Sequence, residues 1–511
     1  MAARPDPRQP CLIGVGRRTW HPEDCGPDGA PEPLTMWEEV ARLADADTGH
    51  PGAIERLERL DVVYCQAWQY DDPPARLAER LGADPKVATY SGIGGNVPQS
   101  IVSNAARDIL RGDLDLALVV GSEALATKRR LAKEGRKPAW SFRPDERRPF
   151  PFDVPPHPGE VTHSIFEAWL TFALFENAHR AHLGMGLEEY RRSLGQLLAP
   201  MTAVAAANPD AWFPVLRGVE EILGPTVQNR MVGYPYSKLM TAIMDVDMAA
   251  AILVASDATA DSLGVPADRR VYLRGWGYAE DPPAVAQRTD LWRSGAMEAA
   301  SAAALQGAGV AADDLAHLDL YSCFTSSIEF ALDALDIDSS SARSADPVAR
   351  PDRTVTVTGG LAYHGGPGSN YLTHSLATMV DTLRADPGAL GMVSGVGMHM
   401  HKHVFAAYST TPGTLVPPDD AAVAAQAAMD ETPIVESFEG PARVATYSVV
   451  HGRDGTPESA ALVCDLDAPP AARCYARFTD PASLAAAESE ELIGRSVKIA
   501  PDGNGGNAAT L

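Results

Sequence analysis

The sequence contains few cysteines and no long hydrophobic run. Its 511 residues include six cysteines, which are scattered and form no CxxC pair. This pattern is typical of reduced thiols in a cytoplasmic protein and excludes a disulfide framework. No apolar stretch is long enough to cross a bilayer, and the N-terminal MAARPDPRQP lacks the layout of a signal peptide. We therefore expect a cytoplasmic protein with no membrane partner.

Positive charge is also scarce. The chain has 43 Lys and Arg against 67 Asp and Glu, a net charge of −24 and a pI near 4.9. This balance argues against nucleic acid as a partner, and an anionic ligand would have to be held by local donors. Hydrophobic residues make up 45% of the chain, which is typical of a globular protein, and the length predicts about two to four domains.

The sequence does contain two units with the same order of segments, at 86–122 and 354–395. Each unit reads strand, glycine turn, helix, strand. Strands are expected at 86–90, 114–122, 354–358 and 390–395, helices at 98–110 and 370–384, and the turns at 91–96 and 359–369. Two such units predict a duplicated α/β domain with both glycine turns near one site.

Three other segments differ in composition. Residues 1–35 are rich in proline and charge and are expected to wrap a surface, and residues 123–236 read as a partly helical insertion. After a linker with one short helix, the chain from 412 onward predicts a small β-rich domain with a hairpin closed by Asp454-Gly455. The last ten residues are expected to be disordered.

Five sequence blocks, in order over roughly residues 30–410, resemble those of the thiolase superfamily. They are GGNVPQSIVSNAARDILRGDLDLALVVGSEAL, YPYSKLMTAIMDVDMAAAILVASDATADSLGVP, DLYSCFTSSIEFAL, TGGLAYHGGPGSNY and MVSGVGMHMHKHVFAAYST. The β-rich tail is similar to the additional C-terminal domain of thiolase-like proteins of type 1, which are often labelled acetyl-CoA acetyltransferase.

The resemblance implies a duplicated five-layer αβαβα fold followed by a small, OB-like β domain. The N-terminal half is expected in 1–122 and 237–269, the inserted loop region in 123–236, and the C-terminal half in 270–411. Residues 412–511 would hold the linker and the additional domain. Thiolases dimerise through strands near the nucleophile loop, and an extra domain that covers this edge would leave a monomer, so both monomer and homodimer stay open.

Four positions of the thiolase catalytic set are changed in this chain. The resemblance places the nucleophilic cysteine at Gly95, the GHP histidine at Gly366, the second cysteine at Val393 and the NEAF asparagine or HDCF histidine at Tyr321. Glycine and valine can neither attack a thioester nor transfer a proton. The glycine turns therefore keep the backbone of an acyl-CoA site without its usual side-chain chemistry.

Three side chains are candidates to replace that chemistry. Cys323 opens a helix, where a thiol would feel the helix N-terminus, although a buried structural cysteine is the alternative. His364 lies two residues before Gly366 and could point into the same pocket or make a loop hydrogen bond. Tyr321 could donate to an acyl oxygen, as tyrosines do in superfamily members that cleave carbon–carbon bonds, or be a satisfied core residue.

Substrate contacts are expected from five positions around the two glycine turns. They are Gly95, Asn96, Gln99, Gly366 and Gly395. Asn96 and Gln99 could bind a thioester carbonyl or cap the following helix. The basic run at 128–137 is either a solvated face or a contact for CoA phosphates.

Two histidine patterns are weak candidates for a metal site. His399, His401 and His403 alternate, and His157-x-x-Glu160-x-x-His163 has a chance-prone spacing. The resemblance implies no metal at the block that holds His399, His401 and His403, and His157 precedes Pro158, so it would not lie within a helix. We therefore expect no metal and no cofactor other than acyl-CoA or CoA itself, as substrate or ligand.

Three functions remain open from the sequence. The first is an acyltransferase or carbon–carbon lyase that acts on acyl-CoA without a cysteine acyl-enzyme, using Tyr321, His364 and backbone N–H groups near Gly95 and Gly366. The second is an inactive protein that binds acyl-CoA or a pantetheine ligand and meets a protein partner through its C-terminal domain. The third, an ordinary thiolase, conflicts with the missing residues.

Overall fold

The computed structural model describes residues 6–349, 351–467 and 469–511. Its larger sheet has nine strands in the order β3-β2-β4-β7-β1-β8-β11-β10-β9. The strands are β1 (Pro10–Thr19), β2 (Arg59–Val62), β3 (Val87–Tyr90), β4 (Leu116–Ala124), β7 (Asp247–Ser256), β8 (Val271–Glu280), β9 (Leu315–Asp319), β10 (Leu390–Gly397) and β11 (Lys402–Ser409). Among the described residues, the two halves of this sheet are joined by two residue pairs between β1 and β8.

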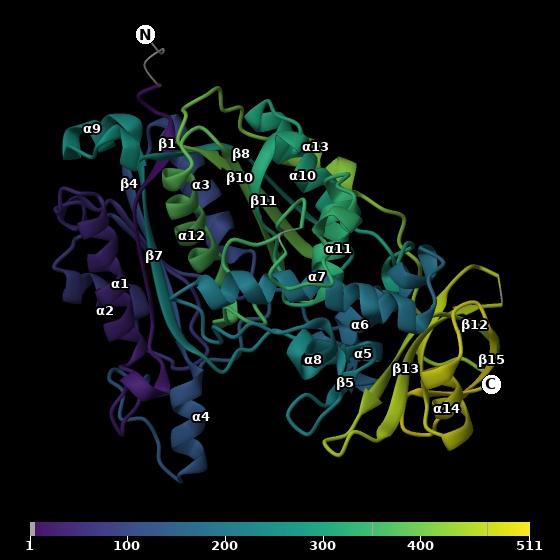
Figure 1. The fold of residues 1–511 in the computed structure, drawn as a ribbon. Coiled ribbons are helices and arrows are strands. Elements are labelled where there is room, and N and C mark those ends of the chain that lie inside the picture. Colours follow the sequence, from purple (N-terminus) through teal and green to yellow (C-terminus); the bar gives the residue numbers. More distant parts are fainter. Residues whose placement is uncertain (1–5, 350, 468) are drawn as a thin grey trace.

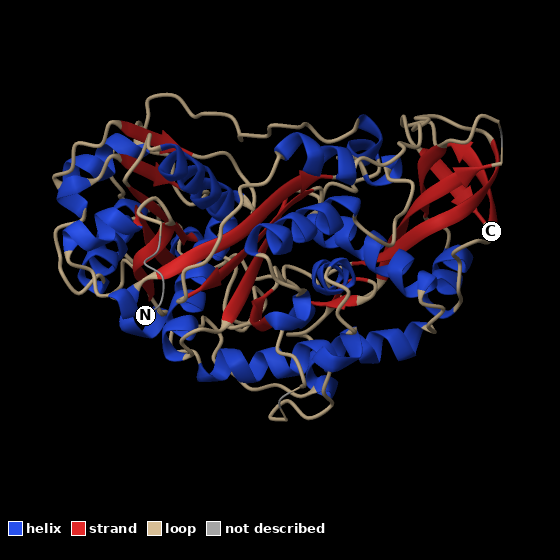
Figure 2. Cartoon of the chain, turned by 90° about the horizontal axis from the view of Figure 1, so that it is seen from above, coloured by secondary structure: helices blue, strands red, loops and turns tan. Residues whose placement is uncertain are grey.

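Helices form three layers around the two half-sheets (Figures 1 and 2). Apolar residues of α3 (Val97–Arg111) and α12 (Tyr371–Ala385) share one core with the facing sides of both half-sheets. α1 (Pro33–Asp47) and α2 (Pro73–Leu81) cover the outside of the first half, and α10 (Gly295–Ala308) and α11 (Thr325–Ala334) that of the second. α9 (Asp257–Leu263) follows β7. The predicted five-layer αβαβα fold is confirmed.

Most elements predicted for the repeated units are present, but the strand at 354–358 is wrong. This segment forms bends, so the second half-sheet lacks a counterpart of β3. The reason is a side chain: the Asp319 carboxylate accepts the N–H groups of Val357 and Thr358, at 2.9 and 3.3 Å. The expectation for residues 1–35 is also wrong, because β1 lies in the middle of the sheet between β7 and β8.

The inserted region is mainly helical. It contains α4 (Leu125–Lys133), α5 (Pro158–Thr162), α6 (Ala168–His182), α7 (Leu187–Ala207), α8 (Val219–Leu223) and the short strands β5 (Met231–Gly233) and β6 (Tyr236–Ser237). Between α4 and α5, residues 138–157 form an extended strap without helix or strand. Among the described residues, no helix is both long and apolar enough to span a membrane.

The C-terminal part is a closed barrel of five strands. They are β12 (Gly440–His451), β13 (Pro457–Leu466), β14 (Arg473–Phe478), β15 (Ser496–Pro501) and β16 (Asn507–Thr510), with α13 (Asp420–Ala427) before them and α14 (Pro481–Ser489) after β14. The predicted β12–β13 hairpin turns at Gly455, whose φ of 84° suits glycine. The expected disorder of the last ten residues is wrong, because β16 pairs with both β14 and β15.

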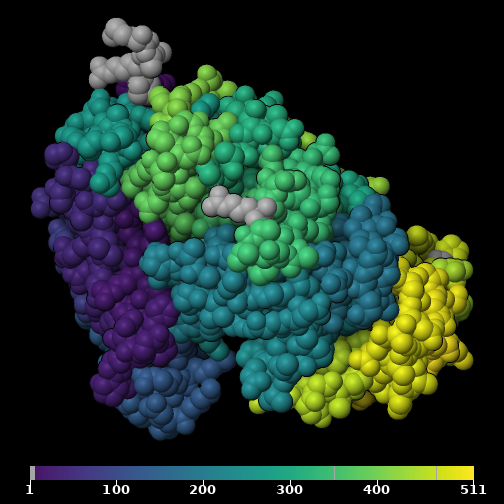
Figure 3. All heavy atoms as spheres, in the orientation of Figure 1, coloured from purple at the N-terminus to yellow at the C-terminus, as the bar shows by residue number. Residues whose placement is uncertain are grey.

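The barrel is joined to the inserted region through buried hydrogen bonds. The Tyr475 hydroxyl donates to Glu160 at 2.9 Å, and the Asn507 N–H donates to His163 at 2.9 Å. Figure 3 shows the barrel, in yellow, against the blue-to-teal inserted region. The first half-sheet ends instead at β3, which pairs only with β2 beside α2. Among the described residues, no barrel strand pairs with β3.

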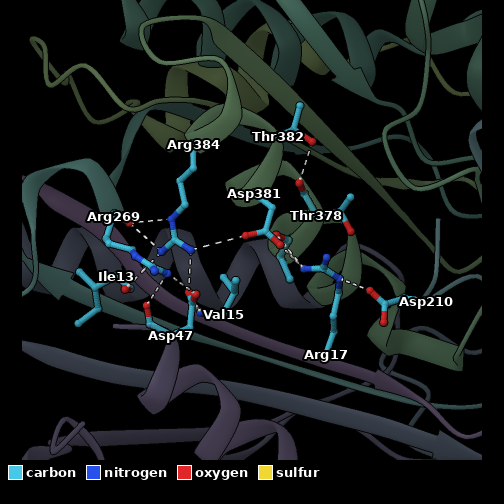
Figure 4. Close-up of polar contacts among 11 residues, drawn as sticks. Ile13, Val15, Arg17, Asp47, Asp210, Arg269, Thr378, Asp381, Thr382 and Arg384 are labelled. Carbon is cyan, nitrogen blue, oxygen red and sulfur yellow. Dashed lines mark hydrogen bonds and ion pairs between the residues drawn. The ribbon is translucent and has the colours of Figure 1, made fainter. Parts of the chain in front are cut away.

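A chain of charged side chains ties the first layers together (Figure 4). Asp47, at the end of α1, lies at its centre. Its carboxylate accepts the N–H of Val15 beside the β1 bulge at 3.0 Å and pairs with Arg269 and Arg384 at 2.9 and 2.7 Å. The chain continues through Asp381 to Arg17 and Asp210. It joins α1, β1 and α12 at the side of the molecule away from the barrel.

Candidate functional site

A cavity of about 640 Å³ lies where both glycine turns meet the inserted region. Its wall includes the turn before α3, the end of β4, the chain before α11 and the turn at 359–369. Much of the remaining wall is aromatic: Phe150 and Phe152 come from the strap, Phe166, Trp169 and Phe172 from α6 and the residues before it, and Phe324 precedes α11. A cavity of this size and lining suits an extended, mostly apolar ligand.

Tyr321 fills the place of a side chain at residue 95. A Cβ atom added to Gly95 would lie 2.1 Å from the Tyr321 hydroxyl oxygen and 2.5 Å from the carbonyl oxygen of Val396. Gly95 and Tyr321 both line the cavity. The position that the resemblance assigns to the nucleophile is therefore occupied by a phenol from the other half of the fold.

The backbone and ring of Tyr321 are firmly held, whereas its hydroxyl is free. The Tyr321 N–H donates to the Ser394 hydroxyl at 2.9 Å, and its ring packs edge-on against Tyr371 at 5.6 Å. In the described part of the chain, the hydroxyl has no hydrogen-bond partner. Burial raises the pKa of Tyr321 well above its usual range, so the phenol is a neutral hydrogen-bond donor toward the cavity.

The two glycine turns offer different backbone groups. The Gly95 N–H makes no hydrogen bond to any described residue and lies at the start of α3, a helix N-terminus. The Gly366 N–H, by contrast, donates to the Ile243 carbonyl at 2.9 Å. Gly366 lines the cavity, but its own N–H is already used and cannot be one of the donors expected near this turn.

His364 does not point into the cavity, and this prediction is wrong. The ring is fully buried, with Nδ1 3.3 Å from the Asn208 amide and its centroid 5.5 Å from that of His374. The backbone explains the direction, because the His364 N–H donates to Gly360 and its carbonyl accepts from Trp212. Burial lowers the pKa of His364 to about 3, so the ring is neutral.

Cys323 lines the cavity, but its thiol is not activated. The sulfur lies 3.7 Å from the Ser327 hydroxyl, and burial raises the thiol pKa to about 12. The expected influence of the helix N-terminus is outweighed by loss of solvent. Little thiolate is present near neutral pH, which fits the structural alternative.

Three further predicted contacts lie behind the cavity wall rather than in it. Gln99 is fully buried and exchanges hydrogen bonds with Ser103 and Tyr408, at 3.1 and 2.7 Å. Asn96 precedes α3 but makes no side-chain cap, and Gly395 packs against Leu372 and Asn96. Of the eight predicted site residues, those in the wall are Tyr321, Cys323, Gly95 and Gly366.

Sequence reasoning missed Glu123. This residue follows the apolar run of β4, is fully buried and lines the cavity. A carboxylate at the carboxyl end of a buried strand was the available signal, since such positions carry ligand contacts in α/β folds. The missed aromatic side chains of the strap had no comparable signal, because extended loops carry no periodic pattern.

A second hollow, of about 910 Å³, adjoins the cavity and is lined by cations. The two share Tyr64, Gln66 and Phe150. Its basic residues are Lys128, Lys137, Arg143, Arg147 and Arg148, and none of them pairs with a carboxylate among the described residues. Lys128 and Lys137 belong to the basic run noted in the sequence.

The histidine patterns make other contacts. His157 caps α5 by accepting the Gly159 N–H, and His163 accepts the Asn507 N–H. His399 and His401 lie in a turn before β11, which removes the assumed strand alternation, and His403 faces Asp281 at 3.3 Å. Within the described ranges, no group of three or more potential ligands is arranged to hold a metal ion.

The fold and the C-terminal domain are similar to those of known proteins. Residues 421–504 match the family model described as the thiolase-like protein type 1 additional C-terminal domain. The fold also matches a monomeric SCP2-thiolase-like protein type 1 from Mycobacterium smegmatis, at 29% identity and a TM-score of 0.84, over 99% of this chain and 100% of that one. The predicted resemblance to thiolase-like proteins of type 1, including their additional C-terminal domain, is confirmed.

More distant matches share the thiolase fold. A structure described as the Ltp2-ChsH2(DUF35) aldolase has 15% identity and a TM-score of 0.57, over 79% of this chain and 98% of that one. The dimeric peroxisomal thiolase of Saccharomyces cerevisiae has 13% identity and a TM-score of 0.53, over 80% and 98%. No curated protein matches the sequence. This chain combines a thiolase-like fold with a cavity in which Tyr321 faces Gly95.

Proposed function

We propose that this protein binds acyl-CoA thioesters and breaks or forms a carbon–carbon bond in them without an acyl-enzyme. The observation that carries the proposal is the Tyr321 hydroxyl at the place of a side chain on residue 95. A phenol there can donate a hydrogen bond to a thioester oxygen, but it cannot take over the acyl group as a thiolate would.

The two adjoining hollows support a CoA-type ligand. Pantetheine and an acyl chain suit the apolar cavity, whereas phosphate groups suit the cation-lined hollow beside it. The protein as a whole carries a charge of −24, so a hollow lined by five cations and one carboxylate, Asp145, is a local exception. The strap residue Phe150 borders both spaces and would lie along the ligand.

Two donors support enolate chemistry at the inner end of the cavity. The Tyr321 hydroxyl and the Gly95 N–H both lack partners in the described chain and lie at adjoining points of the wall. Together they would stabilise negative charge on the thioester oxygen when a bond at the neighbouring carbon breaks. Cys323, with a thiol pKa of about 12, would stay uncharged throughout.

The test combines ligand binding with intact-protein mass. Calorimetry with acetyl-CoA, dephospho-CoA and pantetheine should give the tightest binding for acetyl-CoA, and mass spectrometry should detect no acyl adduct. An adduct lost in Cys323→Ala would overturn the non-covalent mechanism. Binding without turnover of any acyl-CoA would leave the second candidate, a ligand-binding protein, which is favoured by the loss of the four thiolase residues.

A further inference from the structure

The cavity wall holds a titratable side chain, Glu123, in addition to the two donors Tyr321 and Gly95. Glu123 ends β4, is fully buried, and lines the cavity. Its Oε1 accepts the Gln66 N–H at 2.7 Å and its Oε2 accepts the Ala67 N–H at 2.9 Å. No cation pairs with it among the described residues. Each carboxyl oxygen therefore keeps lone-pair capacity beyond these two bonds.

A glycine leaves the carboxyl group open to the cavity. A Cβ atom on Gly368 would lie 2.6 Å from Glu123 Oε1, so any larger residue there would displace the carboxyl group. The next residue, Ser369, accepts the Gly94 N–H at 3.1 Å and so joins this part of the wall to the turn that carries Gly95. Glu123, Tyr321 and both partners of this contact line one cavity.

The surroundings of Glu123 keep its two protonation states close in free energy. Burial raises the pKa of Glu123 to about 7, while the N–H groups of Gln66 and Ala67, Lys128 on α4 and the Cys65 thiol at 3.8 Å oppose this shift. The other titratable groups that face it are Tyr64 and Tyr90, and the pKa of each is raised, so both are neutral. A carboxyl group in this range can both take and return a proton near neutral pH.

We propose that Glu123 is the catalytic base in the cleavage of a 3-hydroxyacyl thioester. This inference rests on the proposed function. Glu123 takes the proton of the 3-hydroxyl group, and the O–H electron pair forms the new C=O bond. The C2–C3 bond breaks, and its electrons pass to the thioester as an enolate held by Tyr321. After the carbonyl product leaves, the proton on Glu123 returns to C2 and gives the shortened acyl thioester.

This substrate class follows from what the cavity contains. Cleavage of a 3-ketoacyl thioester needs a nucleophile to take up the released acyl group, and Cys323 is not ionised near neutral pH. Cleavage of a 3-hydroxyacyl thioester needs only one base and donors for the enolate oxygen. The step balances without oxidant, reductant, metal or second thiol.

The test uses the full chain, 3-hydroxyacyl-CoA substrates and D₂O. Wild type should release an aldehyde or ketone and yield acyl-CoA carrying one deuterium at C2, both read by mass spectrometry. Glu123→Gln should lose both signals by about 100-fold or more, with acyl-CoA binding changed by no more than about threefold. Glu123→Asp should recover part of the activity, and the rise of kcat/KM with pH near 7 should be absent in Glu123→Gln.

The outcomes separate this inference from the proposed function. Failure of wild type to bind acyl-CoA would overturn both. Binding by wild type without cleavage or deuterium uptake would overturn the inference alone, as would full activity in Glu123→Gln. If Glu123→Gln does not fold, as judged by circular dichroism, the pH profiles of wild type and Glu123→Asp decide: a flat profile across pH 6–8 in both would overturn the role of Glu123.

Discussion

The Tyr321 hydroxyl oxygen lies 2.1 Å from the point where a Cβ of residue 95 would stand. A phenol and a nucleophilic side chain are therefore mutually exclusive at this point of the cavity. The Val396 carbonyl, at 2.5 Å from the same point, limits the space further. The absence of a side chain at residue 95 is therefore what allows Tyr321 to take this position.

Gly95→Cys should not restore a thiolase nucleophile. The added side chain meets both Tyr321 and the Val396 backbone, so we expect a loss of about 1–3 kcal/mol in the free energy of unfolding, measured by urea denaturation. Intact mass after incubation with acetyl-CoA should show no adduct. Gly366→Ala is the matched control, because its nearest neighbour would be 3.3 Å away, and it should cost less. Equal losses would contradict the clash.

Tyr321→Phe should separate binding from chemistry. Only the hydroxyl is removed, and it has no partner among the described residues, so stability should change by less than about 1 kcal/mol. Turnover of an acyl-CoA substrate should fall by about 10²–10³-fold, as expected when one oxyanion donor is lost. Tyr371→Phe is the control for a neighbouring tyrosine, because its hydroxyl bonds Asp319 and Thr358 away from the cavity. Unchanged turnover in Tyr321→Phe would remove the phenol from the mechanism.

Glu123 should make stability depend on pH. Its pKa in the folded protein, about 7, exceeds the ordinary value of 4.5, so the folded state binds this proton more tightly than the unfolded chain. This tighter binding adds up to about 3 kcal/mol to the free energy of unfolding. The added stability is fully present below pH 4.5 and is lost as pH rises through 7. Between pH 4.5 and 8, wild type should lose unfolding free energy relative to Glu123→Gln, so the difference between the two proteins should shrink or change sign. Parallel curves would contradict the raised pKa.

Asp47→Asn should destabilise the first half of the fold. The carboxylate holds the Val15 N–H and two arginines, Arg269 and Arg384, while only a fifth of its side chain is exposed. We expect a loss of about 1–3 kcal/mol in unfolding free energy, seen by chemical denaturation. The same substitution at Asp313, whose side chain is 99% exposed, should have little effect. An unchanged free energy of unfolding in Asp47→Asn would show that the β1 bulge beside Val15 holds without the charge network.

The cation-lined hollow should discriminate between ligands by their phosphates. The double variant Arg143→Ala and Arg147→Ala should bind CoA about tenfold or more weakly. Its binding of pantetheine, measured by calorimetry, should be unchanged. Higher salt should weaken CoA binding in wild type more than in the double variant. Arg129→Ala is the control, because that arginine pairs with Asp245 and lies outside the hollow. A similar loss for pantetheine would place the phosphates elsewhere.

The parts of the fold with strong local patterns were predictable, and those set by single side chains were not. Continuous apolar runs and helical periodicity located β4, α3 and α12 within a few residues. The false strand at 354–358 has β-branched residues, but Asp319 takes its N–H groups. His364 was misplaced for a similar reason, since turn hydrogen bonds to Gly360 and from Trp212 decide where its ring points.

Some residues of the candidate site could likewise be predicted from the sequence and others could not. Alignment of the glycine turns brought Gly95, Gly366, Tyr321 and Cys323 to one wall, because backbone shape is what the fold retains. Glu123 stands inside one of the quoted blocks and was passed over, since burial of a carboxyl group is a tertiary property. The raised pKa of Cys323 could not be predicted from the sequence either, because burial raises the pKa of a thiol whereas a helix N-terminus lowers it.

The contact between Tyr475 and Glu160 restricts how this protein can evolve. Glu160 accepts hydrogen bonds from Tyr475 of the barrel, from the Val285 N–H and from the His157 N–H at the end of the strap. Deletion of the barrel would leave the buried Glu160 carboxylate without the Tyr475 donor. It would thereby weaken the attachment of the strap, whose residues line the cavity. Loss of the C-terminal domain therefore requires compensating substitutions in the insertion, and the two segments are expected to be inherited together.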